Sequence, residues 1–524
     1  MASEPLDLAS LESERALDGE QAIPIVATTT VAFIGRTERG PLNEPIAIRD
    51  FDDYRRIFGG YCKFSFVPYA VQHFFLHGGE AAVIVRVANR ATRALLEVPA
   101  GTESLRLQAR NPGSREFLRV SVDYDRVEND PSRFNLVVQR LSRIGSQLVD
   151  DQELFQAVSM EQSDDRHIAA ALRDSELVRL SGPPPACRPD ATRATRPGEP
   201  IPYLGMCLAG SDGEELTDYD IIGSNREGTG LFALDRCSSI DLLCIPSPPG
   251  HDLGITSFVA AARYCERRRA MLVWDPPWSW YSPDAAILSV RSTGQVSANA
   301  ITYFPRVRPR AEQRIYPSGM PACGVVAGIL ARSDRNGVWH RLPLTDSGLK
   351  PNLVPLVDVD AKQTGMLNRI GVNALGRAQA GGAALQGNVS FAGPNLVSSL
   401  WQRLDTRRLT LFILRSIEQH TRWVSAAPAA DLAATLERQV WIFLARIHQQ
   451  GALVGKTSEQ AFFARARVAG TPTTASSEAS AALTLRIGFA LQKANEFVVY
   501  EFRYDERGVS GHGVPVLDAE RYVG

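Results

Sequence analysis

The segment Gly451 to Thr457, GALVGKT, comes nearest in residue types to a phosphate-binding site. In a P-loop, four residues separate the two glycines, a strand precedes the loop and a helix follows it, so that successive backbone amides surround the phosphates. Here only three residues separate Gly451 from Gly455, and the residues before them have helical rather than strand periodicity. We expect a helix ended by glycine and followed by a turn, with a degenerate nucleotide site as the alternative.

His73 and His77 are four residues apart, which places both on one helix face, as in a two-histidine metal site. The Glu of an H-E-x-x-H motif is absent, no third ligand candidate lies nearby, and histidine at this helix end suits the helix dipole. The stretch WDPPWSWYSPDAA, which begins at Trp274, could form a carbohydrate platform, although such stretches more often pack a loop onto its domain. These motifs lead us to expect no metal, no cofactor and no enzymatic activity.

The composition excludes several classes of function. The 524 residues include 57 Lys plus Arg against 58 Asp plus Glu, whereas proteins that coat nucleic acid or lie on anionic membranes need a basic excess. The seven cysteines contain no C-x-x-C pair, which favours free thiols in a reducing compartment. The first twenty residues lack the basic start and apolar core of a secretory signal, and no apolar run approaches a membrane span of ~20 residues. We expect cytoplasmic synthesis, no nucleic-acid partner and no direct membrane insertion.

Hydrophobic periodicity predicts an α/β opening followed by a mainly-β module. Apolar runs ending at Gly35 and Ala88 predict two strands, and apolar residues at helical spacing between them predict two helices that end at glycine pairs. Residues 105–141 alternate between apolar and polar, which is typical of half-buried antiparallel strands. A helix is expected at residues 165–180, and the proline-rich stretch up to Pro202 is expected to be a surface loop or domain boundary.

The second half again alternates between strand and helix. A strand, a helix and a strand between residues 239 and 277 form a βαβ unit, which implies a parallel sheet. The Ala/Gly-rich run Asn373 to Asn388 has few apolar anchors and is expected to be mobile. In the last third we expect a strand at residues 408–417, a helix at residues 434–450, and two closing strands, LTLRIGFAL and EFVVYEFRY.

The two ends of the chain indicate a role in assembly. The first twenty residues carry six acidic residues and too little periodic apolar content to fold alone, whereas Asn495 to Tyr504, NEFVVYEFRY, is strongly β-forming and precedes a tail with little core. A subunit that donates strands to the sheet edge of a neighbour needs such extended ends. The alternative is frayed ends and one internal strand.

Three blocks of sequence carry a resemblance to a known family. They are TTTVAFIGRTERGPLNEPIAIRDFDDYRRIFGG with VPYAVQHFFLHGGEAAVIVRVA, then REGTGLFALD through DLLCIPSP to YCERRRAMLVWDPP, and finally RRLTLFILRSIEQHTRWV with FLARIHQQGALVGKTSEQAFFARARV. In this order they resemble the sheath subunits of contractile phage tails and contractile injection systems. The family's usual W-G-A-R-T-L-like block is replaced here by the Ala/Gly-rich run.

The resemblance implies a multidomain fold of the α/β and α+β classes. An α/β sheath core would be built from N-terminal and C-terminal segments, with an inserted mainly-β outer domain and extended terminal arms. The implied division is 1–22 N-terminal arm, 23–104 N-terminal part of the core, 105–202 inserted outer domain with the proline-rich loop, 203–370 α/β middle domain, 371–395 flexible Ala/Gly-rich segment, 396–504 C-terminal domain facing an inner tube, and 505–524 C-terminal extension.

The resemblance also implies a function. Sheath subunits stack as hexameric rings around an inner tube and contract to drive the tube through a target envelope. The partners would be further copies of the chain, the inner tube protein, and baseplate and tail-terminator or cap proteins, in a phage tail or phage tail-like particle. The residues implied are Phe497, Val498, Val499, Tyr500, Glu501 and Phe502 as an inter-subunit strand, Ile23, Pro24 and Ile25 in the N-terminal arm, and Arg438, Arg446 and Lys456 facing the inner tube.

Three alternatives remain open from the sequence. The chain could be a ring-forming baseplate or tail-terminator component with the same α/β body. It could also be one of several sheath paralogues that share one particle. The third alternative is an enzyme that binds nucleotide at Gly451 to Thr457.

Overall fold

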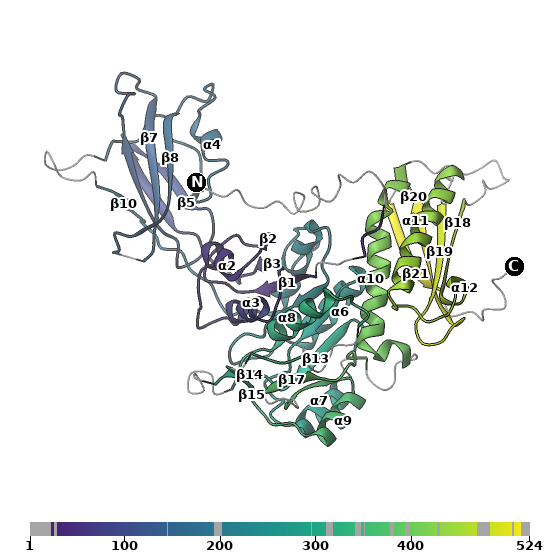
Figure 1. The fold of residues 1–524 in the computed structure, drawn as a ribbon. Helices are drawn as coiled ribbons and strands as arrows, with labels where there is room; N and C mark the ends of the chain where they lie inside the picture. Colours follow the sequence, from purple (N-terminus) through teal and green to yellow (C-terminus); the bar gives the residue numbers. More distant parts are fainter. Residues whose placement is uncertain are drawn as a thin grey trace. The chain divides into compact units, whose positions relative to one another are not determined.

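A computed structural model describes residues 22–25, 29–143, 145–192, 202–294, 296–310, 318–340, 347–350, 352–377, 382–392, 399–426, 430–468, 483–505 and 508–514 (Figure 1). The chain divides into two compact units. The main unit contains Met1–Phe33, Ala70–Val83 and Cys237–Gly524. The insert unit contains Ile34–Tyr69 and Ile84–Arg236.

The largest sheet has eight strands in the order β17-β16-β13-β12-β11-β1-β3-β2. Neighbours from β1 through β16 are parallel, whereas β17 is antiparallel to β16. The central strands are mostly apolar and fully buried, as expected for parallel strands covered on both faces, so the parallel sheet predicted from the sequence is confirmed. The bounds are β1 Thr30–Gly35, β2 Pro45–Ile48, β3 Ala81–Arg86, β11 Leu242–Cys244, β12 Met271–Trp274, β13 Ala300–Phe304, β16 Asn373–Arg377 and β17 Ala383–Gln386.

Helices connect these strands, and α8 (Cys323–Asp334) packs on β11 and β12. Almost every residue of α8 is buried, and its two glycines allow a close crossing with α3 (Val67–Leu76). A Cβ atom on Gly324 would lie 1.9 Å from the carbonyl oxygen of Ala70, so only glycine fits there. The other helices are α2 Phe51–Phe58, α6 Ile255–Arg267, α7 Pro283–Thr293 and α9 Ala361–Arg369, and the short strands β14 Val307–Pro309 and β15 Leu353–Pro355 pair with each other.

The C-terminal part of the main unit consists of two long helices packed on an antiparallel sheet with the order β18-β19-β20-β21 (Figure 1). One apolar core joins these helices and strands. The bounds are α10 Leu404–His420, α11 Ala430–Gln449, α12 Ser458–Ala461, β18 Phe462–Val468, β19 Leu483–Ala490, β20 Phe497–Asp505 and β21 Gly508–Val514, with 3-10 turns η2 Ser399–Gln402 and η3 Arg422–Ala426.

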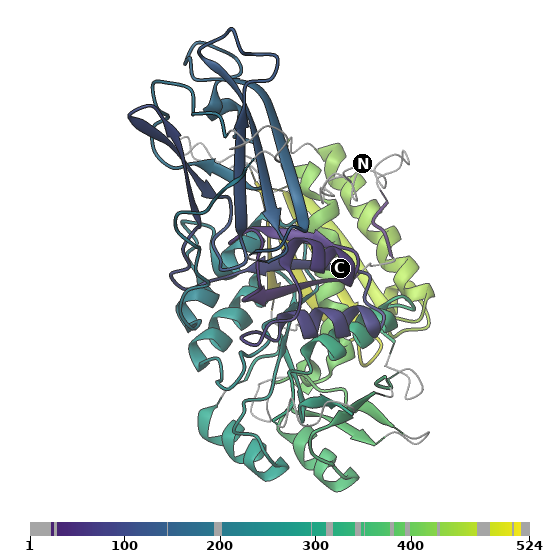
Figure 2. The same ribbon diagram turned by 90° about the vertical axis from the view of Figure 1, so that its left-hand side faces the viewer.

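The insert unit contains a four-stranded sheet, β10-β6-β7-β8, and a three-stranded sheet, β4-β5-β9, and Figure 2 shows its long strands in blue. Alternate residues of these strands, such as Leu118, Val120 and Val122, form one apolar core, so the predicted mainly-β module is confirmed. The bounds are β4 Leu95–Ala100, β5 Glu103–Ala109, β6 Phe117–Asp123, β7 Arg133–Leu141, β8 Val149–Ser159, α4 Ile168–Ala171, β9 Val178–Leu180, β10 Leu204–Gly205, α5 Asp218–Ile222 and η1 Gly230–Arg236.

Three predictions of local structure were wrong. The strand expected at residues 408–417 is the middle of α10, because its apolar residues face a core on one side and its arginines recur at helical spacing. The run expected to be mobile forms β16 and β17, where Gly376 allows close packing against the Gln386 side chain. The helix expected at residues 165–180 is limited to the four residues of α4, and buried Val178 then enters β9. Residues 378–381 and 393–398 of the predicted flexible segment lie outside the described residues.

Candidate functional site

The P-loop-like segment is a turn in which four backbone amides donate hydrogen bonds within the chain. The amides of Gly451 and Ala452 donate to carbonyls of α11, the amide of Val454 donates to Ala490, and the amide of Lys456 donates to Gln460 Oε1. His448 Nε2 also lies 2.9 Å from the Gly455 carbonyl oxygen. Since α11 precedes the turn and the following α12 has only four residues, the geometry is that of a helix end rather than a phosphate cradle.

The two histidines that share a helix face, His73 and His77, are buried in the protein. His77 Nδ1 lies 2.7 Å from the carbonyl oxygen of His73, and His77 Nε2 accepts the amide of Lys350 at 3.1 Å. Burial lowers the pKa of both His73 and His77 to about 4, so both rings are neutral at physiological pH. Among the described residues, no group of three or more His, Cys, Asp or Glu side chains is placed to hold a metal ion.

The N-terminus of α8, beside the carboxyl ends of β11 and β12, is occupied by a carboxylate of the chain itself. In open α/β sheets, ligands often bind at such a point, with phosphates on helix amides. Here Asp275 Oδ1 accepts the amides of Ala322 at 2.8 Å and Cys323 at 2.9 Å. Burial raises the pKa of Asp275 to about 6, against the opposing effects of Cys323 and Arg306. Asp275 therefore takes the place that a ligand's anion would need.

The predicted N-terminal arm residues differ in burial. Ile23 is 1 % exposed and belongs to the apolar core of the C-terminal part, and Ile25 packs partly against that core. Pro24, between them, is exposed. Residues 1–21, the remainder of the predicted arm, lie outside the described residues.

The predicted inter-subunit strand, Phe497 to Phe502, is an interior strand. It forms most of β20, which pairs with β19 on one side and with β21 on the other. The sequence indicated a free strand because it showed a β-forming run before a glycine-rich tail, but part of that tail, Gly508–Val514, is itself β21. With both edges occupied inside the chain, β20 is not the free arm that we predicted.

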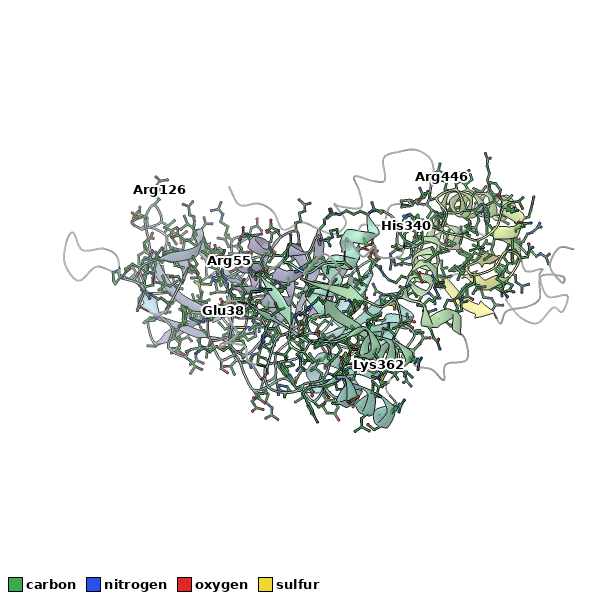
Figure 3. The ribbon with its side chains drawn as sticks, turned by 60° about the horizontal axis from the view of Figure 1, so that its bottom comes forward. Glu38, Arg55, Arg126, His340, Lys362 and Arg446 are labelled. Atoms are coloured by element: carbon green, nitrogen blue, oxygen red, sulfur yellow. The ribbon has the colours of Figure 1, made fainter. Side chains whose placement is uncertain are left out.

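The predicted tube-facing residues lie on α11 and the turn after it. Leu436, Val440 and Ile447 on one side of α11 are buried in the C-terminal core, and Arg438 and Arg446 are exposed on the other. Figure 3 shows Arg446 on the outside of these helices. Lys456 is exposed in the following turn. All three cations therefore project from one helix and its end.

Two exposed apolar residues on α11 were missed in the sequence. Trp441 is 46 % exposed and Ile442 is 36 % exposed, and at helical spacing they lie on the same side as Arg438. We call the exposed side chains Arg438, Trp441, Ile442 and Arg446 the α11 face. The signal was present, because Trp441 and Ile442 fall outside the apolar stripe that continues from Val440 to Leu444 and Ile447.

Solved structures with a similar fold include sheath proteins. The chain matches the sheath tail protein of Listeria innocua with a TM-score of 0.59 and 11% identity, covering 95% of this chain and 98% of that one. The sheath tail protein of Desulfitobacterium hafniense matches with a TM-score of 0.53 and 13% identity over 93% and 99%. The sheath of the extracellular contractile injection system PVC, in its contracted state, matches with a TM-score of 0.51 and 13% identity over 90% of both chains.

At these identities the matches establish the fold. The mixed α/β fold predicted from the sequence resemblance is that of contractile tail sheath proteins. No protein-family model and no curated protein sequence matches the chain. Among the residues that the structure describes, no helix is both long and apolar enough to cross a membrane.

Proposed function

We propose that this chain is a structural sheath subunit of a contractile tail or injection system, which polymerises with itself around an inner tube. The observation that carries the proposal is the agreement of fold over nearly the whole length of this chain and of the Listeria and Desulfitobacterium sheath proteins. A shared fold over a single domain would be weaker support, because one fold hosts many functions. The filled position at Asp275 and the used amides of the GALVGKT turn favour a structural role over catalysis.

The subunits would be linked by exchange of the edge strand β21. β21 is the last strand of its sheet and pairs only with β20 among the described residues. If β21 of one copy pairs with β20 of another, Phe497 to Phe502 become the acceptor for a neighbour's strand instead of the donor. The backbone pairs and side chains stay the same, so exchange costs little beyond association. The other edge, β18, exposes Arg465 and Arg467, charges that discourage unspecific pairing.

The α11 face would contact the inner tube. Its centre is apolar, its ends are basic, and Lys456 adds a third cation in the turn, so the matching surface would be acidic with an apolar recess. Charged contacts screened by solvent can be remade as one surface slides past another, which a contracting sheath requires. Baseplate and terminator proteins would bind the ends of the polymer, and hexameric stacking would follow the family.

Negative-stain electron microscopy of the purified chain, alone and mixed with the inner tube protein of the same particle, tests this function. We expect hollow helical polymers that lengthen with time. A product that stops at one ring would instead assign the chain to a baseplate or tail terminator. Truncation after Asp505 removes β21 and should leave short oligomers, whereas the control truncation after Val514 keeps β21 and should still polymerise.

The α11 face is tested separately by co-sedimentation with the inner tube. The double variant Arg438→Glu/Arg446→Glu should form polymers but lose the tube. The matched control Arg226→Glu changes an exposed arginine of the insert unit and should retain it. Polymers that retain the tube in the double variant would exclude the α11 face as the contact and leave the sheath assignment unaffected.

A further inference from the structure

α10 has two unlike faces. Leu409, Ile413 and Ile417, spaced four residues apart on one face, are buried in the apolar core of the C-terminal part. The other face carries Arg408 and Arg415, which are seven residues apart and therefore lie on the same side of the helix. Apolar contacts thus hold α10 to the C-terminal sheet. The two arginines on its second face contact the α/β part of the main unit.

Each of these arginines binds a carboxylate that lies almost entirely inside the protein. Arg408 Nη2 is 2.5 Å from Asp334 Oδ2 at the end of α8, and their side chains are 10% and 2% exposed. Arg415 Nη2 binds Asp241 Oδ1 just before β11, with side chains 12% and 11% exposed. Burying two ion pairs carries a large desolvation cost, which is offset only where the geometry and the remaining hydrogen bonds are good.

The same two carboxylates also hold the start of β1. Thr29 Oγ1 donates to Asp334 Oδ2 at 2.5 Å, and the Thr30 amide donates to Asp241 Oδ2 at 2.9 Å. Burial raises the pKa of Asp241, whereas Arg415 and the Thr30 amide oppose that rise and so favour its charged form. Each carboxylate therefore has one donor from the N-terminal segment and one from α10.

We propose that Asp241 and Asp334 couple the N-terminal segment to α10, so that release of either one loosens the other. A buried carboxylate that loses one of two donors is left with an incompletely satisfied charge, and the remaining contact becomes less well ordered. By linkage the effect is reciprocal, since whatever displaces α10 also weakens the hold on Thr29 and Thr30. A pull on the N-terminal segment would then reach the C-terminal part through two ion pairs. This coupling is a property of the fold alone, whether or not the chain forms a sheath.

Amide hydrogen exchange on the full chain tests the coupling. Thr29→Val removes the hydroxyl donor at nearly constant volume, and we expect exchange in α10 to accelerate about fivefold or more. In the Arg408→Met background, where the ion pair is already absent, the same change should have less than about a twofold effect in α10. The matched control Thr364→Val removes a hydroxyl on α9 that donates to Asp360 O, and it should leave α10 unchanged.

Two results would overturn the proposal. One is α10 exchange in Thr29→Val equal to that of the unmodified chain. The other is an equal acceleration by Thr29→Val with and without Arg408. If Arg408→Met does not fold, Arg408→Gln also removes the charge while keeping a polar side chain, and the same comparison applies.

Discussion

Ile23 and Tyr504, near opposite ends of the chain, lie in the same apolar core. Both are 1 % exposed, and the Tyr504 hydroxyl is 2.9 Å from Thr421 Oγ1 at the end of α10. The N-terminal segment is thus anchored in the C-terminal part of its own chain from Ile23 onward. Ile23 is therefore a buried anchor point of the N-terminal segment within its own chain.

The anchor predicts a large cost for shortening Ile23. Ile23→Ala removes buried methyl groups from a closed core and should lower the free energy of unfolding by about 2 to 4 kcal/mol. The exposed neighbour provides the control, because Pro24→Ala should change it by less than about 0.5 kcal/mol. Urea unfolding followed by tryptophan fluorescence measures both, and equal effects of the two variants would contradict burial of Ile23.

Two helical glycines predict opposite effects of the same substitution. Gly324→Ala would place a Cβ atom 1.9 Å from the Ala70 carbonyl oxygen, so α3 and α8 must separate. We expect a loss of about 3 kcal/mol or more in the free energy of unfolding. Gly365 on α9 has no atom within 4 Å of the added Cβ, so Gly365→Ala should gain about 1 kcal/mol. Thermal unfolding distinguishes the two, and a stable Gly324→Ala protein would disprove the close crossing.

The sequence predicted strands well, both where one face is buried and where both faces are buried. Alternation at Leu118, Val120 and Val122 identified the antiparallel module, and the apolar runs of the central strands identified the parallel sheet. Residues 408–417 were wrongly predicted to be a strand. One side of α10 is apolar and faces a core, and the arginines on its other side bind buried carboxylates, so few exposed polar residues mark its helical period. Local propensity cannot identify such a helix when its cations are paired inside the protein.

The candidate site was predicted only in part for a related reason. Arg438 and Arg446 were chosen from the family resemblance, and both are exposed, as unpaired charged side chains nearly always are, whereas their contact with a tube stays a prediction. The pairing of both edges of β20 could not be predicted, because β21 is a glycine-rich strand with little apolar content. Asp241 and Arg415 are 174 positions apart, so their contact is a result of the tertiary fold.

The buried histidines predict that the protein is weakened by acid. The pKa of His73 is lowered to about 4 by burial and by His77, so the folded state resists a proton that the unfolded chain accepts near pH 6.5. The contribution of His73 to the free energy of unfolding is fully present above pH 6.5 and is lost as the pH falls toward 4. At pH 5 the loss is about 2 kcal/mol. Between pH 7.5 and pH 5, the free energy of unfolding of His73→Met should fall less than that of the unmodified chain. In the exposed control His340→Met it should fall by as much as in the unmodified chain.

Asp275 predicts a change of stability with pH that is opposite in direction to the change expected from His73. Its pKa is raised to about 6, above the ordinary value of 3.8. Between these two pH values, the folded state therefore keeps a proton that the unfolded chain has released. The contribution of Asp275 to stability therefore falls as the pH rises from 4 to 6 and is constant above that, a total change of about 3 kcal/mol.

Asp275→Asn isolates this contribution, because the amide oxygen can still accept the amides of Ala322 and Cys323 while the titration is lost. Relative to the unmodified chain, the variant should gain about 3 kcal/mol between pH 4 and pH 7 in urea unfolding. Asp284→Asn, at an exposed carboxylate in the first turn of α7, is the matched control, and its difference from the unmodified chain should stay constant over the same range. A constant difference for Asp275→Asn as well would mean that the carboxylate at the start of α8 is charged throughout and is held by its donors rather than penalised by burial.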